Sequence, residues 1–145
     1  MVKKLWDSRI LRWVTPVAWM GVIFYLSAQP ELPDLTHGRP DVQDVAGHFI
    51  LYTVLALLWW RALRQAGVPH SAWWGWVIAL AYGISDEFHQ RFVPNRQADP
   101  LDIATDAAGA MAALVVVHLG QQWIAGRRRA YQRPSSSRAA PHPDP

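Results

Sequence analysis

Four long apolar segments constrain this chain more than any other feature of its sequence. They cover about residues 13–28, 46–63, 72–85 and 101–124. Each reaches or approaches the ~20 residues that an α-helix needs to cross ~30 Å of hydrocarbon. Buried helices of a soluble domain are the alternative, but in a chain of 145 residues these segments leave almost no polar surface to cover them. The sequence therefore predicts an all-α fold, a transmembrane four-helix bundle.

The apolar segments divide the chain into a single membrane domain and two flanks. We expect helices at about residues 13–28, 46–64, 71–88 and 101–124, within a membrane domain of residues 13–126. Residues 1–12 form a basic flank, and residues 127–145 a basic and then disordered tail, because the end of the chain is rich in Pro and Ser. The first segment also resembles a signal peptide. Its N-terminal flank is long, so we expect it to be retained as a signal anchor.

The charged residues are sorted by side of the membrane. If the four helices alternate in direction, the N-terminal flank, the loop after the second helix and the tail lie together. They hold most of the basic residues: Lys3, Lys4, Arg9, Arg12, Arg61, Arg64, Arg127, Arg128, Arg129, Arg133 and Arg138. Basic loops mark the cytoplasmic side. The pattern predicts a multi-pass protein of the bacterial plasma (inner) membrane with both termini cytoplasmic.

The same charge pattern limits the partners that we expect. The net charge is only +3, and the basic residues act as orientation signals, so we expect the lipid bilayer as a partner and no nucleic acid. The chain has no Cys, which excludes disulfides, thiolate metal sites and Cys nucleophiles.

Most polar residues of the apolar segments lie at the helix ends opposite the termini, and Thr15 and His118 are exceptions that lie deeper. Ionisable groups at such depth are costly, so they imply a partner or a function. Asp44, His48 and Tyr52 are four residues apart and therefore share one helix face. The other members of this outer cluster are Ser27 and Gln29 after the first helix, Asp86, Glu87 and Gln90 on the third, Arg96 in the following loop, and Asp99, Asp102, Asp106 and Gly109 on the fourth.

Helical spacing also predicts which cluster members face one another. On the third helix, Gly83, Glu87 and Gln90 share one face, and we expect Asp86 to point elsewhere. One face of the fourth helix carries a continuous stripe of Asp99, Asp102, Asp106 and Gly109. We expect Arg96 to hold one of the nearby carboxylates, Asp99 or Asp102, because it is the basic residue closest to them in sequence.

The excess of carboxylates over bases predicts the chemistry of the cluster. Crowded carboxylates are satisfied by a shared proton, a bound cation or a cationic ligand. His48 facing Glu87 or Asp106 would form a general acid/base pair, so the candidate catalytic residues are His48, Glu87, Asp102 and Asp106. No cofactor is evident. A divalent cation in the carboxylate cluster is a candidate, although the sequence has no motif of fixed metal-ligand spacing. The remaining cluster residues are expected to bind a ligand or to lock the structure: Ser27, Gln29, Tyr52, Asp86, Gln90, Arg96, Asp99 and Gly109.

The order and spacing of these residues resemble the VanZ-like family of small bacterial membrane proteins. The resemblance covers roughly Gly21 to Ala113 and rests on Ser27, Gln29, His48, Tyr52, Glu87, Gln90, Phe92, Pro94, Arg96, Asp99, Asp102 and Gly109. One departure is Asp106, where the family usually has Asn; it adds a possible charge to the cluster. The resemblance implies a cell-envelope role, since the family takes its name from a protein linked to low-level resistance to teicoplanin, a lipoglycopeptide that acts outside the membrane.

Several functions are compatible with the sequence. The first is binding of an envelope lipid or lipoglycopeptide at the outer cluster. The second is a membrane-embedded hydrolase or transferase that acts on a lipid-linked substrate through His48 and the carboxylates. The third is a purely structural role, in which the cluster locks the bundle. Conduction of protons or cations is disfavoured, because the inner halves of all four segments are apolar.

Overall fold

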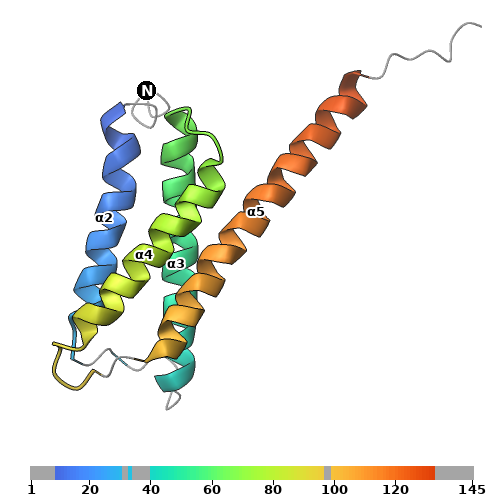
Figure 1. The fold of residues 1–145 in the computed structure, drawn as a ribbon. Coiled ribbons are helices and arrows are strands. Elements are labelled where there is room, and N and C mark those ends of the chain that lie inside the picture. The colour runs from blue at the N-terminus through green and yellow to red at the C-terminus, as the bar shows by residue number, and fades with distance from the viewer. Residues whose placement is uncertain (1–8, 31–32, 34–39, 97–98, 133–145) are drawn as a thin grey trace, which may run out of the picture.

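The computed structural model is all-helical. It describes residues 9–30, 33, 40–96 and 99–132, and these ranges contain no strand. The four helices are α2 (Arg9–Ser27), α3 (Pro40–Gln65), α4 (Ser71–Gln90) and α5 (Pro100–Gln132) (Figure 1). The predicted all-α architecture of four helices is confirmed.

All four helices are longer than the apolar segments that predicted them. Both α3 and α5 begin at a proline, which is favoured in the first helical turn because its fixed φ suits the helix. At its other end, α5 continues through Arg127–Arg129 instead of ending near residue 124, because Arg, Ala and Gln are good helix formers. The basic flank contributes residues 9–12 to α2. Residues 1–8 and the tail from residue 133, where we predicted disorder, lie outside the described residues.

Of the helices in the described part of the chain, three can cross a membrane by length and composition. These spans are Ile10–Ser27, Val42–Gln65 and Pro100–Tyr131. The remaining helix, α4, ends in the polar sequence SDEFHQ, and its buried face runs from Gly75 to Gln90. It contacts all three of the others.

Close contacts without intervening side chains join α3 to α4 and α5. A Cβ atom at Gly75 would lie 2.8 Å from the carbonyl oxygen of Ala56, and one at Gly109 would collide with the carbonyl of Phe49. Small residues allow membrane helices to approach in this way. The hydroxyl oxygen of Thr53 lies 2.7 Å from the carbonyl oxygens of both Gly109 and Phe49, so its proton is shared between α5 and its own helix. The described parts of α2 and α5 do not contact each other, so α3 and α4, which each contact all the other helices, form the centre of the bundle.

Side-chain hydrogen bonds to the backbone attach α2 to the rest of the bundle. The Trp19 indole donates to the carbonyl of Leu51 at 3.0 Å, and the Tyr82 hydroxyl donates to the carbonyl of Met20 at 2.7 Å. No glycine of α2 makes a close approach, because a Cβ atom at Gly21 would meet nothing within 4 Å. The α2 helix is therefore held less tightly than the others.

The bundle is apolar outside and polar inside at one end. Large apolar side chains such as Phe24, Ile50 and Val116 are at least half exposed, whereas Asp86 and Asp106 are buried. A soluble protein shows the opposite arrangement, so this distribution identifies a membrane protein.

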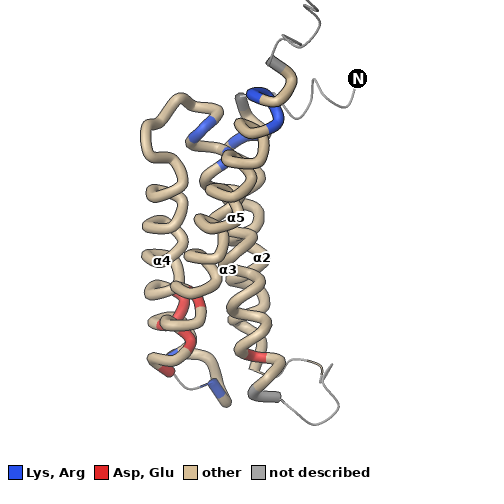
Figure 2. The backbone as a smooth tube through the Cα atoms, turned by 90° about the vertical axis from the view of Figure 1, so that its right-hand side faces the viewer, with Lys and Arg blue, Asp and Glu red and all other residues tan. Residues whose placement is uncertain are grey.

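The charges mark the two ends of the bundle (Figure 2). The acidic end contains the C-terminal turns of α2 and α4 and the N-terminal turns of α3 and α5. Two of the described basic residues, Arg91 and Arg96, also lie at this end. The basic end holds the start of α2, the end of α3 and the end of α5. The N-terminal end of α2 and the C-terminal end of α5 thus lie on the same side.

Candidate functional site

A buried pair of ionisable residues connects α3 to α5 at the acidic end. His48 Nδ1 donates a hydrogen bond of 2.9 Å to Asp106 Oδ1, and the two side chains are only 11% and 2% exposed. Of the two partners expected for His48, Asp106 is the one that bonds it. Gly83 makes room for this carboxylate, since a Cβ atom there would lie 2.7 Å from Asp106 Oδ2. The His48 ring is parallel to that of Tyr52, with the centroids 6.3 Å apart.

A second buried carboxylate connects α4 to α2. The Ser27 hydroxyl donates to Asp86 Oδ2 at 2.6 Å, and the Gln90 amide donates to the same oxygen at 3.4 Å. The prediction that Asp86 points away from the face of Gly83 and Gln90 was wrong. Because α4 contacts α2, α3 and α5, its buried face is wide enough to include both Asp86 and Glu87.

Arg96 closes the acidic end from the loop after α4. Its Nη1 donates to Asp44 Oδ1 at 3.2 Å, and its Nε donates to the carbonyl of Gln29 at 3.3 Å. The expected partners were Asp99 and Asp102, and this expectation was wrong. Asp99 instead caps α5, because its Oδ1 accepts the backbone N–H of Leu101 at 2.8 Å. The left-handed conformation of Asn95, with φ of 62°, turns the chain just before Arg96.

Seven buried side-chain polar atoms have no hydrogen-bond partner among the described residues, and three of them belong to predicted site residues. These three are Tyr52 Oη, Asp86 Oδ1 and Glu87 Oε1. Asp86 is close enough to Tyr52 to act on it electrostatically, yet the two make no hydrogen bond of good geometry. Buried groups of this kind cost about 1–3 kcal/mol each when they stay unsatisfied. At the acidic end, these three atoms are available to bind a ligand.

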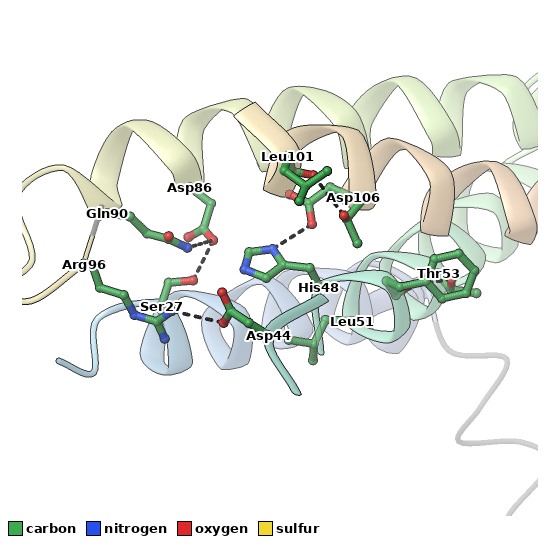
Figure 3. Close-up of polar contacts among 12 residues, drawn as sticks. Ser27, Asp44, His48, Leu51, Thr53, Asp86, Gln90, Arg96, Leu101 and Asp106 are labelled. Carbon is green, nitrogen blue, oxygen red and sulfur yellow. Dashed lines mark hydrogen bonds and ion pairs between the residues drawn. The ribbon is translucent and has the colours of Figure 1, made fainter. Parts of the chain in front are cut away.

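A cavity of about 360 Å³ lies among α2, α3 and α4 at this end. Its polar part consists of Ser27, Asp44, His48, Tyr52, Asp86, Gln90 and Arg96, several of which are shown in Figure 3. Its apolar wall includes Ile23 and Leu26 from α2 and Ile50 and Leu51 from α3. Since Ile50 is 59% exposed, the apolar wall reaches the outer surface of the bundle.

Three residues at the acidic end could hold a metal ion. Asp44, His48 and Asp102 each offer a ligand atom, and these atoms all lie within 4.8 Å of one another. Asp102 comes from the first turn of α5, whereas the other two are one turn apart on α3.

The predicted site residues occupy different places at the acidic end. Those in the cavity wall are Ser27, His48, Tyr52, Asp86, Gln90 and Arg96. Three others are buried: Glu87, Asp102 and Asp106. Asp99 caps α5, and Gly109 allows the close approach of α3 and α5. The Gln29 amide donates a hydrogen bond to the carbonyl of Tyr25. Asp44 also lines the cavity. The sequence placed it in the outer cluster, four residues before His48, but we did not predict it as a catalytic or ligand-binding residue.

A comparison with protein families adds to this geometry. The model of a family described as VanZ/LLP1 matches residues 12–121. This range contains every residue of the cavity wall and the buried pair of His48 and Asp106. Comparisons with curated proteins and with solved structures found no match.

Proposed function

We propose that this chain, which belongs to the VanZ/LLP1 family, binds an amphipathic lipid of the bacterial envelope in the cavity among α2, α3 and α4. The head group lies against the polar part of the cavity, and an acyl or prenyl chain lies along its apolar wall. The protein is a multi-pass protein of the plasma (inner) membrane, and the acidic end faces outward.

The two-part cavity is the observation that carries this proposal. Its volume of about 360 Å³ falls in the ~300–1,000 Å³ range of ligand pockets. One half presents buried acceptors and donors, and the other half presents aliphatic side chains next to the membrane. A fully polar molecule would leave the aliphatic half unused, and a hydrocarbon would leave Tyr52 Oη and Asp86 Oδ1 unsatisfied. An amphipath satisfies both.

The outward orientation is supported by the basic end. Arg12, Arg64 and Arg127–Arg129 lie there, and Lys and Arg flank membrane helices mainly on the cytoplasmic side. The polar half of the cavity therefore faces the side where cell-wall precursors and lipoglycopeptides are found.

The binding proposal is tested by filling the cavity. Gly47 lines it, and a Cβ atom at this position would meet nothing within 4 Å, so Gly47→Phe can project a ring into the cavity without a backbone clash. Gly21→Phe is the matched control, since Gly21 is equally open but does not line the cavity. A photo-reactive residue at Ile50 should crosslink an envelope lipid in native membranes, and mass spectrometry identifies the adduct.

The expected result is loss of the Ile50 adduct in Gly47→Phe and its retention in Gly21→Phe. Equal crosslinking in both variants would mean that Ile50 only touches bulk lipid, and it would contradict the proposal. If teicoplanin competes with the lipid for crosslinking, the ligand extends to lipoglycopeptides, and Gly47→Phe should then also abolish any low-level teicoplanin resistance that the protein confers.

An enzymatic role is the second candidate, and the buried pair of His48 and Asp106 favours it. A histidine fixed by a carboxylate at one ring nitrogen can act as a general base with the other. In this case, His48→Gln and Glu87→Gln should stop turnover of the crosslinked lipid without abolishing its binding. If both variants still bind lipid and still confer any teicoplanin resistance that the wild-type protein confers, catalysis is excluded.

A further inference from the structure

We infer that the acidic end binds a divalent transition-metal ion between Asp44, His48 and Asp102. The ligand atoms of these residues already lie within 4.8 Å of one another, so one ion can contact all three. The inference goes beyond the proposed lipid-binding function and does not depend on it.

The orientation of His48 suits it for a metal. Its Nδ1 is engaged by Asp106 at 2.9 Å, which leaves Nε2 as the ligand atom. Figure 3 shows this second ring nitrogen on the side of Asp44, away from Asp106. A carboxylate that accepts the other N–H of a metal-binding histidine is common in metal sites, where it fixes the tautomer and the ring orientation. Asp106 would have this role here.

The charges around the three residues also favour a bound cation. Arg96 is the basic side chain bonded there, and it reaches only one oxygen of Asp44. Glu87 is 4% exposed, and its Oε1 has no hydrogen-bond partner among the described residues. Asp102 and His48 are among the groups near enough to act on it electrostatically. A buried carboxylate with an unpaired oxygen is costly, and a dication between the carboxylates would offset that cost.

The donor set indicates the kind of metal. One imidazole nitrogen with two carboxylates suits Zn²⁺ and similar first-row ions, whereas Mg²⁺ and Ca²⁺ prefer oxygen ligands alone. Three protein ligands leave a position open for water or for an oxygen of a bound head group. The side chain of Asp44 is 40% exposed, so an ion can enter from the aqueous side.

Zinc binding by the full-length protein in detergent tests the inference. The protein carries no histidine tag, is stripped with a chelator and is titrated with Zn²⁺ in the presence of excess Mg²⁺, with calorimetry and elemental analysis as readouts. We expect one Zn²⁺ per chain that Mg²⁺ does not displace. Asp102→Asn and Asp44→Asn should each abolish this site. The matched control is Asp99→Asn, which should bind normally because Asp99 caps α5.

Two further variants separate the possible outcomes. Asp106→Asn keeps an acceptor for His48 and should lower zinc affinity by roughly 10–100-fold, as loss of a charged outer partner does in other sites. Leu26→Trp, in the apolar wall on α2, should block lipid and still bind zinc, because α2 carries none of the three metal ligands, so the metal site and the lipid site can fail separately. Absence of specific zinc binding to the folded wild-type protein, or equal binding by Asp44→Asn and Asp102→Asn, would overturn the inference.

Discussion

The contact between α3 and α5 at Gly109 allows a stability prediction with an internal control. In Gly109→Ala, the new methyl group would collide with the backbone carbonyl of Phe49, and a backbone atom cannot turn aside as a side chain can. The two helices must separate locally, which also weakens the hydrogen bond from Thr53 to the carbonyl of Gly109. In Gly120→Ala on the same helix, the methyl group meets nothing within 4 Å.

The magnitude follows from the difference between the two variants. Both gain helix propensity of up to about 1 kcal/mol, and this contribution cancels in the comparison. Overpacking costs about 1–3 kcal/mol, and loss of an interhelical hydrogen bond in a membrane protein costs about 0.6 kcal/mol. Gly109→Ala should therefore be about 2–4 kcal/mol less stable than Gly120→Ala.

Unfolding in mixed micelles measures this difference. Increasing the fraction of a denaturing detergent while following tryptophan fluorescence gives the free energy of unfolding of each variant in the same lipid-like environment. Equal stability of the two variants would refute the close approach of α3 and α5 at Gly109.

Three other perturbations test the remaining parts of the acidic end and the topology. Ser27→Ala removes a donor from a buried carboxylate and should lower stability by about 1–3 kcal/mol in the same unfolding assay, whereas the exposed Ser85→Ala should be neutral. Arg96→Ala should cost only about 1 kcal/mol, because its carboxylate partner is 40% exposed and can be hydrated; a loss of several kcal/mol would show that the ion pair is buried. A single cysteine at the exposed Phe92 should react with an impermeant thiol reagent added outside intact cells, and one at Ala66 should not; the reverse labelling would invert the proposed orientation.

The sequence was informative about the fold because each helix carries its own signal. Apolar runs of near-membrane length predicted four helices, and the spacing of Asp44, His48 and Tyr52 placed them on one face. The structure confirms the helices and brings His48 and Tyr52 to the same cavity wall. These features depend on helical periodicity alone, which can be seen in a single sequence.

The pairing of the polar residues could not be predicted in this way. Whether His48 bonds Glu87 or Asp106 depends on how α4 and α5 are rotated about their axes, and both carboxylates lie at a similar depth. Gly83 on α4 leaves space for the Asp106 side chain of α5, which favours Asp106 as the partner of His48. Residue spacing along the sequence does not reveal such a contact between helices. The partner of Arg96 was missed for a related reason, because the backbone turn at Asn95 determines where the guanidinium points.

The weak attachment of α2 has a consequence for the order in which the molecule is assembled. This helix is made first and is apolar enough to enter the bilayer alone. Its hydrogen-bond partners, such as the carbonyl of Leu51 and the side chain of Asp86, belong to helices made later. Because α3, α4 and α5 make most of the interhelical contacts among themselves, we expect this trio to associate first and α2 to dock last. Since α2 supplies one wall of the cavity, a ligand site exists only after this final step, and ligand binding would report that the protein is completely assembled.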